Sequence, residues 1–210
     1  MKKYLMEGIG TFFLTLAMVL ATARGNALAT PWAAGSMLAA LTLAGRNVSG
    51  AHFNPAVSLA NLIQGRLDRR DILYYIVAQL LGSVLAMFIA AFLWRCNGVA
   101  EIIVRTNDPF CALIAEFIGV TLLAFVFLQV SAVQTDAGSP LQGLTTGFAL
   151  AAGIFLFVDF SGGFFNPAVA VAMAMAGYSA WADLWQYLLS AILGAVAAAS
   201  LFRLVSGEQS

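Results

Sequence analysis

The residues whose type and spacing most clearly suggest chemistry are two asparagines, Asn54 and Asn166. Each of them opens the tripeptide Asn-Pro-Ala. Asparagine is among the strongest N-cap residues of a helix, and proline suits the first helical turn. Each tripeptide therefore predicts a helix start, where free N–H groups carry a partial positive charge. Each side-chain amide can also donate an N–H to a passing oxygen while its carbonyl caps the helix. This chemistry binds an oxygen transiently and breaks no covalent bond.

The two tripeptides belong to a longer pattern that occurs twice. The string Ser-Gly-x-x-Phe-Asn-Pro-Ala-Val begins at Ser49 and again at Ser161, 112 residues later. An earlier match pairs Glu7 with Glu116, 109 residues apart, and each glutamate is followed three positions later by a glycine. These matches indicate an internal duplication.

Hydrophobic segments must position these residues. Of the 210 residues, 61% are hydrophobic and 10% are charged, whereas about a quarter of the residues in a soluble domain are charged. Two short apolar pieces follow the asparagines and predict half-helices over 55–62 and 167–176. Six longer stretches are candidates for spanning a bilayer, which takes about 20 apolar residues: 4–23, 32–45, 71–94, 109–133, 140–160 and 181–204.

The sequence thus predicts an all-α membrane protein with six transmembrane helices and two re-entrant half-helices. We expect one domain over 1–210, with repeat 1 over about 1–100 and repeat 2 over about 109–205. Because each repeat holds an odd number of spans, the second enters the membrane from the opposite side and the repeats are inverted. Basic residues near the span ends place both termini in the cytoplasm of a bacterial inner membrane.

Composition excludes several other classes of protein. Basic and acidic residues number 10 each, so no net charge attracts nucleic acid. Cys96 and Cys111 lack the spacing of a zinc site or a disulfide scaffold, and we expect no metal or cofactor.

Lys2 and Lys3 before an apolar stretch imitate a secretory signal. However, Glu7 lies near the start of that stretch and the segment recurs in mid-chain, which favours a retained helix.

The paired motifs, the repeated Glu7 and Glu116, and Ala78-Gln79 with Gly82 resemble the aquaporin (major intrinsic protein) family over nearly the whole chain. The resemblance implies a pore in each chain and a homotetramer in the lipid bilayer. Two half-helix N-termini meeting near the midplane would oppose the entry of cations. The resemblance also implies that the two glutamates support the pore loops, and that uncharged solutes cross without catalysis, so that the protein is not an enzyme.

In such a pore, backbone carbonyls form a polar ladder along one side and apolar side chains form the opposite wall. His52 is expected to be a hydrogen-bonded residue of the vestibule. The expected pore residues are Asn54, Pro55, Ala56, Asn166, Pro167 and Ala168 at the motifs, Gly50, Ala51, His52, Gly162, Gly163 and Phe164 in the loops, and Leu38 and Leu150 in the wall.

The expected selectivity filter departs from the family pattern. Water-selective members narrow the outer mouth with an aromatic residue, a histidine and an arginine that directly follows the second Asn-Pro-Ala. Here that position is Val169, and an ungapped count places the others at Ala34, Ile154 and Gly163. Glycerol channels of the family usually keep the arginine and place an aspartate next, where this chain has Ala170. We therefore expect a wide apolar mouth that passes polyols, urea or neutral metalloid hydroxides such as arsenite, together with water.

Other functions stay open at this stage. The chain could be an ordinary water-selective channel whose filter lies elsewhere. A secondary transporter also uses inverted repeats and broken helices, and its coupling site would have to come from Glu7, Glu116, Asp159 and His52. An intramembrane enzyme is disfavoured because neither His-Glu-x-x-His nor Gly-x-Ser-x-Gly occurs. A structural junction protein would show no solute flux.

Overall fold

The computed structural model describes residues 1–26, 28–97, 108–132 and 141–206, and these residues form helices and connecting turns without a strand. The predicted all-α fold is confirmed. The long helices are α1 (Lys2–Thr22), α2 (Ala29–Ser49), α4 (Ile72–Asn97), α5 (Pro109–Ala132), α6 (Leu141–Ser161) and α8 (Leu184–Ser206). The short ones are α3 (Pro55–Ile63), α7 (Pro167–Met175) and the 3₁₀ turn η1 (Trp181–Asp183).

Within the described residues, five helices are long and apolar enough to cross a membrane: α1, α4, α5, α6, and α8 together with η1. The sixth expected span corresponds to α2, which has 21 residues like α1 but a less apolar composition. Its polar residues include Arg46 and Asn47. The helix is also longer than the predicted 32–45 segment, because it begins at Ala29 and continues to Ser49.

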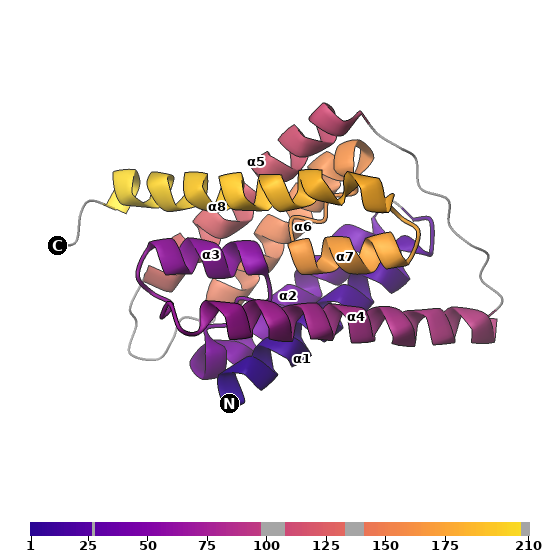
Figure 1. Ribbon diagram of the computed structural model, residues 1–210, viewed down its shortest axis with the longest axis horizontal. Helices are drawn as coiled ribbons and strands as arrows, with labels where there is room; N and C mark the ends of the chain where they lie inside the picture. The colour runs from indigo at the N-terminus through magenta and orange to yellow at the C-terminus, as the bar shows by residue number, and fades with distance from the viewer. Residues whose placement is uncertain (27, 98–107, 133–140, 207–210) are drawn as a thin grey trace.

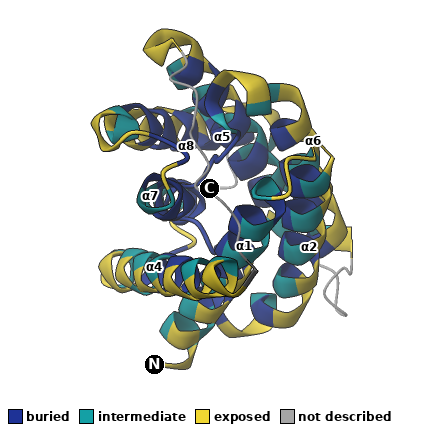
Figure 2. Cartoon of the chain, turned by 90° about the vertical axis from the view of Figure 1, so that its right-hand side faces the viewer, coloured by how far each residue is buried: buried dark blue, intermediate teal, exposed yellow. Residues whose placement is uncertain are grey.

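The helices place large apolar side chains outward and polar side chains inward. Leu81, Phe88 and Phe92 of α4 are each more than 60% exposed, and exposed residues follow the outer faces of the helices (Figure 2). Inside, Thr15 and Ser83 are fully buried and their hydroxyl oxygens lie 2.6 Å apart. An apolar exterior suits contact with lipid, and the polar interior matches the place where intramembrane polar groups normally lie.

The two half-helices lie between α4 and α8, roughly end to end, with their N-termini facing each other (Figure 1). Helix α3 packs against α8, and α7 packs against α4. Helix pairs α1/α4 and α2/α6 cross at glycines. A Cβ on Gly82 would lie 2.2 Å from the carbonyl oxygen of Gly8, and one on Gly147 would lie 2.3 Å from that of Gly35. Small residues at these crossings allow the backbones to approach closely enough to hold the half-helices in place.

Candidate functional site

Asn54 and Asn166 cap α3 and α7 and also join the two half-helices. Each Oδ1 accepts the backbone N–H two residues later, at 2.8 and 3.0 Å. The Nδ2 of Asn54 donates to the carbonyl of Phe165 (2.8 Å), and the Nδ2 of Asn166 donates to the carbonyl of Phe53 (2.9 Å). An amide nitrogen carries two hydrogens, so one N–H of each asparagine remains for a solute. The reciprocal bonds bring the two helix N-termini to the same point.

The loop that leads into α3 is organised by the carboxylate of Glu7, which is fully buried. Its Oε1 accepts the hydroxyl of Ser49 (2.6 Å) and the N–H of His52 (3.0 Å). Its Oε2 accepts the N–H of Phe53 (2.6 Å) and the side-chain amide of Gln79 (2.8 Å). Four donors satisfy one buried carboxylate, which fixes the backbone of the loop.

The loop that leads into α7 repeats this arrangement with Glu116. Its Oε1 accepts the Ser161 hydroxyl (2.7 Å) and the N–H of Phe164 (2.9 Å), and its Oε2 accepts the N–H of Phe165 (2.7 Å). Among the described residues no side chain takes the place of Gln79, because the position 112 residues later is Ala191. Both glutamates thus lie where loop support requires them.

The loop backbones turn their N–H groups toward the glutamates by adopting left-handed conformations. Ala51, Phe53 and Phe165 have φ values of 58°, 50° and 48°, which side-chain-bearing residues rarely adopt. Within the described residues, no hydrogen bond ends on the carbonyls of residues 50–52 or 162–164. The six expected ladder carbonyls thus have no hydrogen-bond partner among the described residues.

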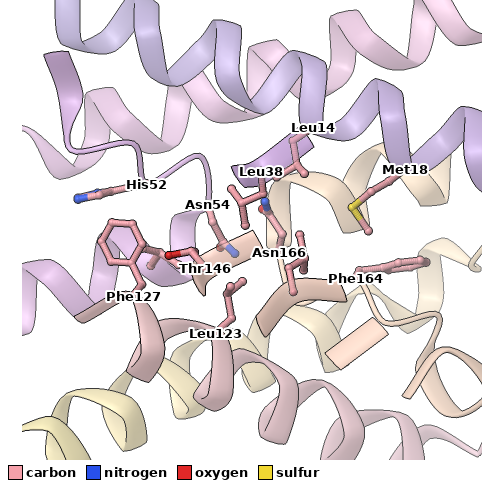
Figure 3. Close-up of a pocket in the computed structure, with 12 residues that line it drawn as sticks. Leu14, Met18, Leu38, His52, Asn54, Leu123, Phe127, Thr146, Phe164 and Asn166 are labelled. Carbon is pink, nitrogen blue, oxygen red and sulfur yellow. The ribbon is translucent and has the colours of Figure 1, made fainter. Parts of the chain in front are cut away.

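A narrow cavity of about 10 Å³, room for about one water molecule, lies beside the two asparagines (Figure 3). Most of its lining residues form pairs related by the 109- or 112-residue offset of the sequence repeat. The pairs are Leu14 with Leu123, Met18 with Phe127, Leu38 with Leu150, His52 with Phe164 and Asn54 with Asn166, and Val57 and Thr146 complete the lining. The walls are mainly apolar, and the polar groups are few.

Several of these lining residues were missed at the sequence level although a signal for them existed. Met18 and Phe127 lie eleven positions after Glu7 and Glu116, and the leucines of the first pair lie seven positions after them. Residues seven and eleven apart share one face of a helix. The face that carries each glutamate therefore also faces the cavity.

A second, polar hollow of about 480 Å³ opens at one end of this cavity, and we refer to it as the vestibule. Its lining includes Lys3, Arg46, Arg66 and Asp71, so the start of α1 and the segment after α3 lie at the same end of the molecule. Lys3 and Tyr4 both donate hydrogen bonds to Asp71, and the bond from Lys3 holds the pKa of that carboxyl below its ordinary value.

The four expected filter positions are buried, and none of them lines the cavity. Ala34, Ile154 and Val169 have no exposed surface, and a Cβ on Gly163 would lie 3.1 Å from the Cα of Ile154. The cavity is lined instead by the neighbouring residue Phe164, together with Met18. The filter assignment stays a prediction.

The described residues bring together no obvious coupling site for a transporter. Asp159 is exposed near the end of α6, whereas Glu7 and Glu116 are buried in separate hydrogen-bond sets. No group of three or more His, Cys, Asp or Glu side chains within the described residues could hold a metal ion. Cys96 and Cys111 are exposed free thiols.

Comparison with known proteins gives consistent matches. The family model described as "Major intrinsic protein" matches residues 1–202. The "Glycerol uptake facilitator protein-like 6" of Lactiplantibacillus plantarum is 35% identical over 99% of this chain and 100% of that protein. Aquaporin NIP1-2 of Arabidopsis thaliana is 31% identical over 98% of this chain and 74% of that protein.

Among solved structures, the aquaglyceroporin from Plasmodium falciparum superimposes with a TM-score of 0.79, covering 98% of this chain and 96% of that one. Its sequence identity is 21%, so this likeness concerns the fold.

Proposed function

The chain belongs to the major intrinsic protein family, and we propose that it is a passive membrane channel for small uncharged solutes that include polyols, urea or neutral metalloid hydroxides such as arsenite, with water as a further permeant. Members of this family are channels and not enzymes. The observation that carries the proposal is the meeting of two Asn-capped half-helices, each with one amide N–H left for a solute.

The physical mechanism needs no bond to be broken. A solute oxygen accepts from Asn54 and Asn166, while solute hydrogens are donated to the loop carbonyls and the leucine wall excludes competing water. Each half-helix N-terminus is equivalent to roughly half a positive charge. Two of them facing one pore disfavour cations, and an apolar lining adds a desolvation cost that any ion must meet.

We propose that four residues set the largest width of solute that the pore admits: Ala34, Ile154, Gly163 and Val169. A valine in the place of the family arginine removes a fixed cation and its N–H donors, so the mouth can accommodate solutes larger than water. The relative of Lactiplantibacillus plantarum, named as a glycerol uptake facilitator-like protein, supports a permeant of this size.

We further propose that the chain is one domain of two inverted repeats, that both termini are cytoplasmic in a bacterial inner membrane, and that four chains form a homotetramer. The matched hydrogen bonds of Glu7 and Glu116 support the repeats. Lys3 lines the vestibule, and Arg203 near the end of α8 donates to the carbonyl of Ile63. The start of α1 and the end of α8 therefore lie at the same basic end of the molecule, which supports the proposed orientation.

Stopped-flow light scattering on proteoliposomes tests the proposal with water, glycerol and urea. Wild type should pass all three above the rate of protein-free vesicles. Val169→Arg should lower glycerol and urea permeability by about tenfold or more, equivalent to about 1.4 kcal/mol of barrier. Val169→Leu, which adds bulk without charge, should lower them less. Water permeation alone in wild type would favour the water-selective alternative, and no flux at all would favour a structural role.

A further inference from the structure

Two residues separate the central cavity from the vestibule. His52 and Phe127 line both spaces, and no other residue in the part of the chain that the structure describes lines both. Their rings lie 5.5 Å apart between centroids at an interplanar angle of 86°, an edge-to-face contact. A solute that moves between the vestibule and the asparagines must therefore pass this ring pair.

Phe127 is held in place from the vestibule side. Arg66, in the segment after α3, donates through Nη1 to the carbonyl of Leu128 (2.9 Å), the residue next to Phe127. The guanidinium also lies over the ring of Phe202 at 4.6 Å. The side chain of Phe127 is only 2% exposed. This part of α5 is thus tied to two other elements, and the ring has little freedom to move aside.

The hydrogen-bond network behind His52 determines which ring nitrogen carries a proton. Glu7 can only accept, so the atom of Gln79 that faces it is the nitrogen, and that same nitrogen donates to the Ser58 hydroxyl oxygen (3.0 Å). The Ser58 hydrogen is then free to go to Nδ1 of His52 (3.1 Å). We assign the hydrogen of a neutral imidazole to Nε2 on this network, so that His52 offers one N–H donor to a solute.

A hydroxyl acceptor lies at the same end of the cavity. Thr146 gives its hydrogen to the carbonyl of Gln142 (2.8 Å), which leaves the lone pairs of Oγ1 for a solute. Figure 3 shows Thr146 beside Phe127, with the His52 imidazole pointing away from Asn54. A donor, an acceptor and an aromatic edge thus occur together at the vestibule end.

Among the described residues, those that line the other end of the cavity lack these groups. The repeat places Phe164 where His52 stands and Met18 where Phe127 stands. Ala170 and Ala191 replace the Ser58 and Gln79 that orient the histidine. Phe164 stacks on Tyr187 at 5.0 Å, as His52 lies near Tyr75 at 5.3 Å. The two ends share a geometry but differ in chemistry.

We propose that the vestibule end, formed by His52, Phe127 and Thr146, is the constriction that selects among uncharged solutes, and that it favours solutes able both to donate and to accept a hydrogen bond. This proposal rests on the channel function and adds to it a second place of selection. The ring of Phe127 limits the size of the solute. The hydroxyl or amide groups of the solute form hydrogen bonds with His52 and Thr146 as it passes.

The test compares Phe127→Ala with the matched variant Met18→Ala at the opposite end. Proteoliposomes are challenged with water, glycerol and the four-carbon polyol erythritol in stopped-flow measurements. Because the Phe127 ring narrows the passage, its removal should raise the ratio of erythritol to water permeability about three- to tenfold, equivalent to about 0.7–1.4 kcal/mol of barrier. Met18→Ala should change the ratio by less than about twofold, because Met18 lines the opposite end of the cavity. Phe127→Met, nearly isosteric, serves if the alanine variant does not fold, and should raise the ratio in the same direction.

The outcomes separate this proposal from the channel function itself. A ratio that rises with Phe127→Ala or Phe127→Met and not with Met18→Ala supports selection at the vestibule end. If wild type passes glycerol but only Met18→Ala raises the ratio, or none of the variants does, selection lies elsewhere and the proposal is overturned while the channel stands. If wild type and every variant match protein-free vesicles for all three permeants, both are overturned.

Discussion

At the scale of single residues, the two buried glutamates show how hydrogen bonds from a loop can hold a carboxylate inside the protein. Each accepts hydrogen bonds from the backbone of its loop and from a serine hydroxyl. Burying a carboxylate is costly unless donors surround it. Here the donors are the loop N–H groups, so the glutamate and the loop satisfy each other.

The glutamine substitution distinguishes support from transport. In the wild type, the N–H groups of Phe164 and Phe165 donate to the carboxylate oxygens of Glu116. Glu116→Gln places an amide N–H against one of these two N–H groups. We expect the free energy of unfolding to fall by about 1–3 kcal/mol, the cost of a buried unsatisfied donor. The measurement is the thermal unfolding of the variant in detergent, with solute flux per folded molecule measured in parallel. Retained stability with lost flux would contradict a purely supporting role.

At the scale of elements, the half-helix loops depend on glycines in the first helix of each repeat. A Cβ on Gly119 would lie 1.9 Å from the ring of Phe165, and a Cβ on Gly10 would lie 2.1 Å from that of Phe53. Both phenylalanines have positive φ values. The helices therefore carry a notch at the point where each loop ring packs, and this explains the glycine three residues after each glutamate.

Gly119→Ala is expected to destabilise the fold because the added methyl group and the Phe165 ring cannot share the notch. Overpacking of this kind costs about 1–3 kcal/mol. The double variant Gly119→Ala with Phe165→Leu should recover part of the loss, which a double-mutant cycle of unfolding temperatures would reveal. An unfolding temperature of Gly119→Ala equal to that of wild type would show that the loop does not pack as described.

The ends of α1 and α4 are joined by Lys3 and Asp71. The pKa of Asp71 is held down in the folded state, so the stabilisation is present above the ordinary aspartate pKa of about 3.9 and is lost as the pH falls through the lower folded value. Wild type should unfold at a higher temperature than Asp71→Asn at neutral pH, and the difference should shrink as the pH falls below about 4. A difference that does not change with pH would contradict this role.

At the scale of the whole molecule, the sequence predicted the fold well and the pore lining only in part. The Asn-Pro caps of α3 and α7 were readable because capping is local chemistry. The long helices could likewise be predicted, because the thickness of the bilayer sets how many apolar residues a span needs. Phe127 and Met18 were not foreseen, although each shares a helix face with a repeated glutamate, because only the crossing of the helices shows that this face meets the cavity. The sharing of one amide N–H between the half-helices was also hidden, since it joins Asn54 to a residue 111 positions away.

The passive nature of the channel is the central claim, and initial glycerol flux into wild-type proteoliposomes tests it most directly. Flux would be recorded over a range of glycerol concentrations, with and without an imposed proton or sodium gradient. The described residues form no cluster of titratable groups beside the cavity. The glycerol flux should therefore rise in proportion to the glycerol concentration and should not depend on either gradient. A rate that saturates and follows a proton or sodium gradient would contradict the channel and establish a coupled transporter.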